Sequence, residues 1–126
     1  MTDTIKIYLV FVSKYRRKVF DGDAIERLRG MFSKVCEDFG SQMVEMDGET
    51  DHVHLLVNYP PSVSVSKLVN SLKGASSRRL RVERPDIANR YYWRGALWSP
   101  SYFAASCGGA PIAVVRQYIE QQATPD

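Results

Sequence analysis

Apolar residues along the chain follow two periods, one typical of strands and one typical of helices. Residues 5–12 form a run of apolar, β-branched and aromatic side chains interrupted only by Lys6, which predicts a buried strand. Shorter strand-like runs follow at residues 43–46 and 51–58. Between the runs, apolar residues recur every three or four positions, as in amphipathic helices. The first helix is marked by Ile25, Leu28, Phe32, Val35 and Phe39, and the second by Val65, Leu68, Val69, Leu72 and Ala75.

Turn and cap residues separate these elements. Asp21-Gly22-Asp23 offers a turn and an N-cap for the first helix, and Gly40 is placed to end that helix. Asp47-Gly48 is typical of a hairpin turn between two strands. Either Ser64 or Ser66 can cap the second helix.

The last third of the chain supplies a fourth strand and a third helix. Tyr91-Tyr92-Trp93 and residues 97–105 provide the strand material, and Gly108-Gly109-Ala110-Pro111 breaks the chain before a helix over residues 112–122. The order β-α-β-β-α-β-α predicts an α+β fold, a ferredoxin-like β-α-β-β-α-β sheet with helices on one face plus a C-terminal helix. We expect one domain over residues 1–126, with a core over 1–107 and a hinge, helix and tail over 108–126.

Composition narrows the class of protein. The chain is 44% hydrophobic and 25% charged, as in ordinary globular proteins, and no apolar run approaches the ~20 residues that span a bilayer. The first residues lack the layout of a secretion signal, so we expect a cytoplasmic protein. Cys36 and Cys107 form no C-x-x-C pair and are interpreted as reduced and structural rather than as zinc ligands.

The net charge of +3 conceals an uneven distribution of charge along the chain. Residues 1–18 and 52–84 are strongly basic, whereas residues 19–51 are strongly acidic. If the two basic segments meet in space, they could hold a phosphate backbone. The alternative is two solvated faces that bind no ligand.

Both histidines of the chain lie in one predicted strand, at His52 and His54. Side chains alternate between the faces of a strand, so the two imidazoles should share one face while Val53 and Leu55 point into the core. The pair could therefore share one metal ion. The alternative is a pair of exposed hairpin residues that bind nothing.

The last helix places Tyr118 and Gln122 four residues apart, and hence on one face. They lie beside the apolar stripe that docks this helix, where they could face a cleft. The alternative is a partly buried tyrosine that completes the core.

With these motifs in order, the chain resembles the single-tyrosine, histidine-hydrophobic-histidine (HUH) transposases, the TnpA group of the insertion sequence 200/605 type. The resemblance covers nearly the whole chain. Its motifs are Lys14-Tyr15-Arg16-Arg17-Lys18, Asp51-His52-Val53-His54-Leu55-Leu56, Pro60-Pro61, Leu72-Lys73-Gly74-Ala75-Ser76-Ser77-Arg78, Leu97-Trp98-Ser99-Pro100-Ser101-Tyr102-Phe103 and Tyr118-Ile119-Glu120-Gln121-Gln122.

The resemblance implies a metal-dependent enzyme that cleaves and rejoins single-stranded DNA. Tyr118 would attack a phosphodiester to give a 5′-phosphotyrosine link and a free 3′-hydroxyl. The metal ligands would be His52, His54 and Gln122, a mixed nitrogen and oxygen set that suits Mn²⁺ and tolerates Mg²⁺. Asp51 could be a further ligand, although a structural or orienting role is favoured.

The resemblance also implies DNA hairpins at the ends of an insertion element as substrate. The enzyme would be a homodimer in which the tyrosine helix of one subunit could serve the other, with Gly108-Gly109 as the hinge. It would act at the nucleoid of a bacterial or archaeal cell. Lysine and arginine would hold phosphates, and Trp98 could stack on bases or belong to the core. The expected DNA-binding residues are Lys14, Arg16, Arg17, Lys73, Ser76, Ser77, Arg78, Arg79 and Trp98.

Three other classes of protein remain open at this point. One is a related histidine-pair nuclease, such as a domesticated repeat-associated transposase. Another is a non-catalytic RNA- or DNA-binding module on the same ferredoxin-like layout, which would tolerate loss of Tyr118. The third is a zinc hydrolase that uses His52 and His54.

Overall fold

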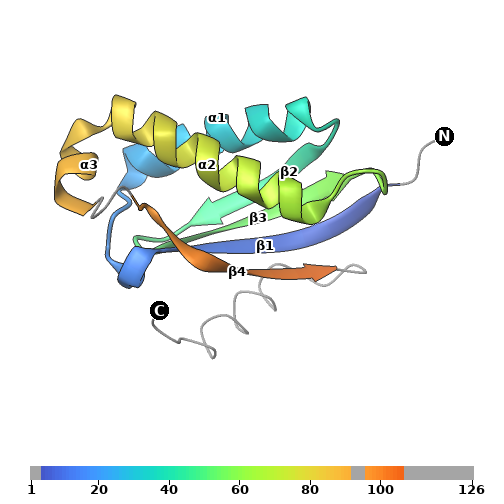
Figure 1. Ribbon diagram of the computed structural model, residues 1–126, viewed down its shortest axis with the longest axis horizontal. Helices are drawn as coiled ribbons and strands as arrows, with labels where there is room; N and C mark the ends of the chain where they lie inside the picture. Colours follow the sequence, from blue (N-terminus) through green and yellow to red (C-terminus); the bar gives the residue numbers. More distant parts are fainter. Residues whose placement is uncertain (1–3, 92–95, 107–126) are drawn as a thin grey trace.

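In the part of the chain that the structure describes, four antiparallel strands form one sheet, and two long helices pack on one of its faces (Figure 1). The computed structural model describes residues 4–91 and 96–106. The elements are β1 (Ile5–Ser13), a short 3-10 turn η1 (Lys14–Arg16), α1 (Gly22–Asp38), β2 (Gln42–Gly48), β3 (His52–Tyr59), α2 (Val65–Glu83), α3 (Pro85–Tyr91) and β4 (Trp98–Ser106).

The sheet has the strand order β2-β3-β1-β4, with β1 and β3 in the centre. Each neighbouring pair is antiparallel. This order is the one that a β-α-β-β-α-β chain adopts when its two helices cover the same face. The predicted α+β, ferredoxin-like sheet with helices on one face is therefore confirmed. The predicted C-terminal helix lies outside the described residues.

The core lies between the sheet and the two long helices. Phe11 of β1 packs edge-to-face against Phe32 of α1 and Trp98 of β4, with ring centroids 5.9 and 5.8 Å apart. The indole Nε1 of Trp98 donates a buried hydrogen bond of 3.0 Å to Oγ of Ser76 in α2. These contacts bind the first and last strands to both helices, because each large ring touches more than one element.

The ends of the helices follow the predicted signals. The Asp21 carboxylate accepts from Ala24 N at 2.8 Å and caps α1, and Gly40 has a φ of 63° just beyond its end. Of the two predicted caps for α2, the structure uses Ser64, whose Oγ accepts from Lys67 N at 3.3 Å. None of the helices in the described part is both long and apolar enough to cross a bilayer.

The helix α3 was not predicted, and Tyr91, which was assigned to strand material, lies in it. Pro85 opens this helix, where its missing N–H costs nothing, and Asp86 lies in the first turn, where a negative charge is favourable. Both signals are in the sequence.

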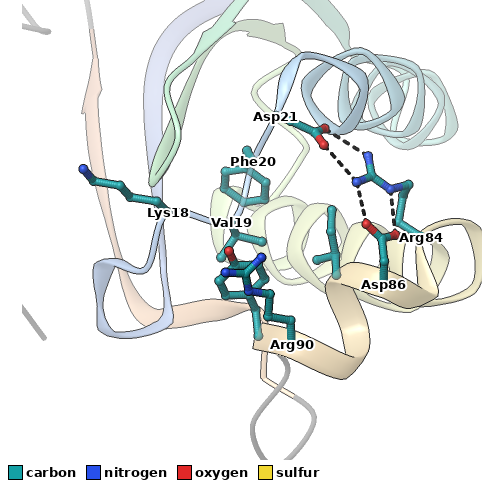
Figure 2. A pocket seen from close by; sticks show the side chains of 9 residues that line it. Lys18, Val19, Phe20, Asp21, Arg84, Asp86 and Arg90 are labelled. Carbon is teal, nitrogen blue, oxygen red and sulfur yellow. Dashed lines mark hydrogen bonds and ion pairs between the residues drawn. The ribbon is translucent and has the colours of Figure 1, made fainter.

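Arg84 ties α3 to the start of α1. Its guanidinium bonds the carboxylates of Asp21 and Asp86 at 2.8–2.9 Å (Figure 2). It also bonds the carboxylate of Asp23 at 2.8 Å. Arg84 holds the pKa of Asp21 at about 2, well below its usual range. A small pocket of about 240 Å³ beside this cluster is lined by residues such as Phe20 and Arg90.

The predicted hairpin turn at Asp47-Gly48 is wrong in position. β2 continues through Gly48, and the reversal is made by residues 49–51, where Glu49 N donates to His52 O at 2.9 Å. Gly48 lies in the strand and not in the turn, and it faces the first helix. A Cβ at this position would lie 2.6 Å from Cδ1 of Ile25 in α1. The glycine allows the first helix to pack closely on the sheet.

Candidate active site

The two histidines lie side by side on the sheet face that the long helices do not cover. Val53 and Leu55 of β3 belong to the core beneath the helices, so His52 and His54, which alternate with them, face the other way. The imidazole centroids are 5.8 Å apart. The side chains are not exposed hairpin residues, because only 7% of His52 and 2% of His54 is accessible.

Asp51 orients the first imidazole. Its Oδ1 accepts from Nδ1 of His52 at 2.8 Å, and its Oδ2 pairs with Nη2 of Arg16 at 3.2 Å. A carboxylate on Nδ1 fixes the tautomer and leaves Nε2 as the nitrogen that can bind a metal. Asp51 precedes β3 rather than lying in it, so it can reach its neighbour.

A second carboxylate lies near the other imidazole. Asp47 of β2 is directly opposite His54 in the sheet register, and its Oδ2 is 3.7 Å from Nε2 of that histidine. This carboxylate is about half exposed. The two histidines are therefore flanked by one acidic side chain each.

The described residues supply only some of the ligands that a divalent metal ion would need. His52 and His54 offer two imidazoles on one face, as a shared ion requires. The residues that the structure describes contain no group of three or more His, Cys, Asp or Glu side chains around one point. The third predicted ligand, Gln122, and the predicted nucleophile, Tyr118, lie outside those residues, as do the Gly108-Gly109 hinge and Cys107.

The basic turn after β1 carries an exposed aromatic ring. Tyr15 and Arg16 have φ values of 59° and 52°, a left-handed conformation that costs side-chain-bearing residues about 1–2 kcal/mol each. Tyr15 is 46% exposed, with Lys14 Nζ 5.3 Å and Arg17 Cζ 5.6 Å from its ring centroid. Sequence reasoning did not single out Tyr15 as a candidate for base stacking, although its place inside a basic run was a usable signal.

Two of the predicted DNA-binding residues belong to the core. Trp98 is 7% exposed and packs against three phenylalanine rings, and Ser76 is fully buried as its hydrogen-bond acceptor. A side chain in this position cannot stack on a base or reach a phosphate without unfolding. For Trp98 the structure thus decides between the two interpretations in favour of the core.

The other predicted residues of α2 have different surroundings. Lys73 donates to Ser99 O at 2.7 Å and to Ser101 O at 3.0 Å, which pins β4 to the helix. Together with Ser77 and Tyr102 it lines a shallow groove of about 310 Å³.

The two arginines that follow are exposed. Arg78 lies next to Gly74, 3.2 Å from where a Cβ at that glycine would be. Arg79 pairs with Glu83, which also pairs with Arg27 of α1. Arg79 therefore lies on the helical layer, across the sheet from the histidines.

Proteins of known class are similar to this chain in sequence and in fold. Residues 1–122 match the family model described as "Transposase IS200 like". The ISDra2 transposase TnpA of Deinococcus radiodurans is 32% identical over 94% of this chain and 84% of its own length. The transposase for insertion sequence element IS200 of Salmonella typhimurium is 32% identical over 96% of this chain and 78% of its own.

Two solved structures of transposases also resemble the fold of this chain. A crystal structure described as that of a transposase from Deinococcus radiodurans superposes with a TM-score of 0.82 at 30% identity, over 97% of this chain and 93% of the other. The structure of a REP-associated tyrosine transposase bound to a REP hairpin superposes with a TM-score of 0.64 at 12% identity. The match covers 95% of this chain and 64% of the other, and at this identity it shows a common fold only.

The four-stranded sheet with two helices on one face is thus the fold of a transposase. The chain belongs to the IS200-like transposase family. Cleavage of DNA and transfer of strands are the activities that this family implies, and the resemblance seen in the sequence is confirmed.

Proposed function

We propose that the protein cleaves and rejoins single-stranded DNA at the ends of an insertion element through a 5′-phosphotyrosine intermediate. The observation that carries the proposal is the pair His52 and His54, two imidazoles 5.8 Å apart on one face of a central strand. Membership of the transposase family supplies the type of reaction.

The proposed metal ligands are His52, His54 and Gln122, with Mg²⁺ or Mn²⁺ as the ion. When bound, the ion would polarise a phosphodiester and neutralise the charge that develops on it. Two imidazoles and an amide carry no charge, so they would leave the full charge of the ion for the phosphate. The Asp51 carboxylate contributes by holding the ring of His52 through Nδ1.

Tyr118 is the proposed nucleophile. Its phenolate oxygen would bond to phosphorus as the 3′-oxygen of the preceding nucleotide leaves, and the phenol proton would pass to solvent or to a base. A free phenol has a pKa of about 10, so it needs this assistance at neutral pH. Because the phosphotyrosine link conserves the energy of the phosphodiester, a 3′-hydroxyl can later attack it and restore the strand without ATP.

Contact with DNA is assigned to two regions. Lys14 and Arg17 of the basic turn would hold phosphates while Tyr15 stacks on an unpaired base. On the α2 side, Ser77 and Arg78 are proposed to contact the strand. A transposase of the same fold is bound to a REP hairpin, which supports a DNA hairpin as substrate.

The proposed assembly is a homodimer in which the tyrosine helix of one subunit can complete the site of the other. Gly108-Gly109 would be the hinge for that exchange. Whether Tyr118 acts in its own subunit can be tested by mixing a Tyr118→Phe protein with a His54→Ala protein. Recovered cleavage in the mixture is expected for action in the partner.

The decisive experiment incubates the protein with hairpin-bearing single strands and Mn²⁺ and looks for a protein–DNA adduct that survives denaturation. Wild type should form the adduct, whereas Tyr118→Phe should bind the same DNA with unchanged affinity and form none. Tyr59→Phe, a tyrosine at the end of β3, is the matched control and should react as wild type does. Full cleavage by Tyr118→Phe, or an adduct on another residue, would overturn the proposal.

Metal dependence separates this proposal from a zinc hydrolase. After chelation, Mg²⁺ or Mn²⁺ should restore cleavage and Zn²⁺ should not. Activity with Zn²⁺ alone would favour the hydrolase.

A further inference from the structure

We infer that Arg16 is a positioning residue for the metal centre, acting on His52 through Asp51, rather than a phosphate-binding residue. The inference rests on the proposed metal-binding role of the histidine pair. It assigns to one arginine of the basic turn a role that its neighbours in the same turn do not share.

The contacts form a continuous chain of three side chains. Nη2 of Arg16 is 3.2 Å from Oδ2 of Asp51, and the other oxygen of that carboxylate is 2.8 Å from Nδ1 of His52. The Arg16 and Asp51 side chains are only 24% and 22% exposed. A carboxylate that is held at both oxygens cannot rotate away from the imidazole, so the ring orientation is fixed before any metal arrives.

The backbone is bent out of its ordinary range to make this contact. Arg16 has a φ of 52° and the preceding Tyr15 a φ of 59°, although neither is a glycine or an asparagine. Left-handed backbone at residues with bulky side chains is uncommon and gathers at functional sites. Here it has a geometric consequence: the exposed Tyr15 and the half-buried Arg16 diverge, one toward solvent and one toward Asp51.

The surrounding segments brace the turn against the strand that carries the histidines. Ser13 N donates to Asp51 O at 2.9 Å, and Lys14 N donates to Leu97 O at 2.8 Å. The Ser13 hydroxyl closes the turn by donating to Arg17 O at 2.7 Å. The turn is thus connected to the residue before β3 through its backbone as well as through Arg16.

The side chain of Arg16 also has a buried donor whose cost to stability needs an explanation. Within the part of the chain that the structure describes, its Nε is buried without a hydrogen-bond partner. Buried, unsatisfied donors are uncommon in folded proteins. An arginine kept in left-handed backbone with an unpaired donor is better accounted for by what its Nη2 holds. Arg17, one residue on, is exposed and lies over Tyr15, as expected of a residue that meets DNA.

The first test reads the tautomer of His52 directly. Long-range ¹⁵N–¹H correlation spectra of the metal-free protein, recorded with the imidazoles neutral, should show the Nδ1–H form at His52. Asp51→Ala and Arg16→Ala should shift it toward a mixture of tautomers. Arg16→Lys, which keeps a cation beside the carboxylate, should retain most of the Nδ1–H form. Arg17→Ala is the matched control and should leave the spectrum unchanged.

The second test measures Mn²⁺ affinity by calorimetry. Loss of an outer partner of a metal ligand typically weakens binding by about 10–100-fold, so Arg16→Ala and Asp51→Ala should each lose about tenfold. The double variant should lose little more than Asp51→Ala alone, because the two act through one path. Circular dichroism of each variant excludes a loss of folding, with Arg16→Lys as the milder change.

The outcomes separate this inference from the proposed function. If wild type binds no Mn²⁺, the proposed metal centre fails, and the tautomer spectra still decide the role of Arg16. An unchanged tautomer and unchanged Mn²⁺ affinity in Arg16→Ala would overturn the inference. It would be replaced by a phosphate contact if that variant instead lost DNA affinity with a shallower salt dependence.

Discussion

The indole of Trp98 donates its N–H to the hydroxyl of Ser76, 3.0 Å away, inside the core between β4 and α2. Ser76 in turn donates to Lys73 O at 3.1 Å within the helix. Both groups of this pair are satisfied by each other rather than by solvent. The contact fixes the last described strand against the second helix, so it bears on stability and not on recognition.

Replacing Ser76 by alanine should destabilise the fold and leave the chemistry intact. The substitution leaves a buried indole N–H without its acceptor, which costs about 1–3 kcal/mol. Urea unfolding should show a lower midpoint with an unchanged slope, while adduct formation per folded molecule stays at the wild-type level. Ser66→Ala, exposed on the first turn of the same helix, is the control and should shift the free energy of unfolding by less than about 0.5 kcal/mol.

Loss of Arg84 should change how stability depends on pH. Arg84 lowers the pKa of Asp21 to about 2 and that of Asp86 below its usual value. A carboxyl whose pKa is lower in the folded state stabilises the fold fully above the unfolded pKa of about 4 and loses this contribution as the pH falls toward 2.

The expected result is therefore a gap in urea midpoint between wild type and Arg84→Ala that is wide near neutral pH and closes between about pH 4 and about pH 2. Arg90→Ala, an exposed arginine beside the same pocket, should shift the midpoint by an amount that does not depend on pH. A gap for Arg84→Ala that persists at about pH 2 would show that packing rather than charge is responsible.

Gly48→Ala should destabilise the protein by about 0.5–1.5 kcal/mol, since the new Cβ would meet Cδ1 of Ile25 and force that side chain away from its present rotamer. Ile25→Val removes that methyl group, so the double variant Gly48→Ala with Ile25→Val should recover part of the loss. Thermal unfolding of the two single variants and the double variant measures the coupling. Strict additivity would mean that the contact is not the cause.

Tyr15→Ala should weaken binding of single-stranded DNA by about 5- to 150-fold, the range that corresponds to ~1–3 kcal/mol for one stacked base. Tyr15→Phe keeps the aromatic face and should bind as wild type does. Fluorescence anisotropy with a labelled hairpin-bearing strand measures both. Equal affinity for Tyr15→Ala and wild type would remove this ring from the proposed DNA contact.

The sequence was sufficient for the features that depend on local periodicity. Alternation along residues 51–58 placed His52 and His54 on the face opposite the core, because the two-residue repeat of a strand is a property of the backbone. Caps at Asp21 and Gly40 were recognisable for the same reason. The order of these elements then limited the sheet to one familiar topology.

The features that the sequence did not reveal depend on distant partners. Arg84 and Asp21 meet across 63 positions of sequence, so no local pattern indicates the ion-pair cluster that they form. Ser76 and Trp98 are buried by each other. Left-handed backbone is usually predicted from a glycine or an asparagine, and neither occurs at Tyr15 or Arg16. The contact between Arg16 and Asp51 could therefore not be predicted from the residue preferences of turns.

The central position of β3 in the sheet also protects the histidine pair against local unfolding. His54 is bracketed in register by Val10 of β1 and Asp47 of β2, so its backbone can separate only when two neighbouring strands part. In native-state hydrogen exchange, amides of this strand should be among the slowest in the protein. The arrangement of the two imidazoles would then be lost only by global unfolding, whereas the edge strand β4 could fray without disturbing it.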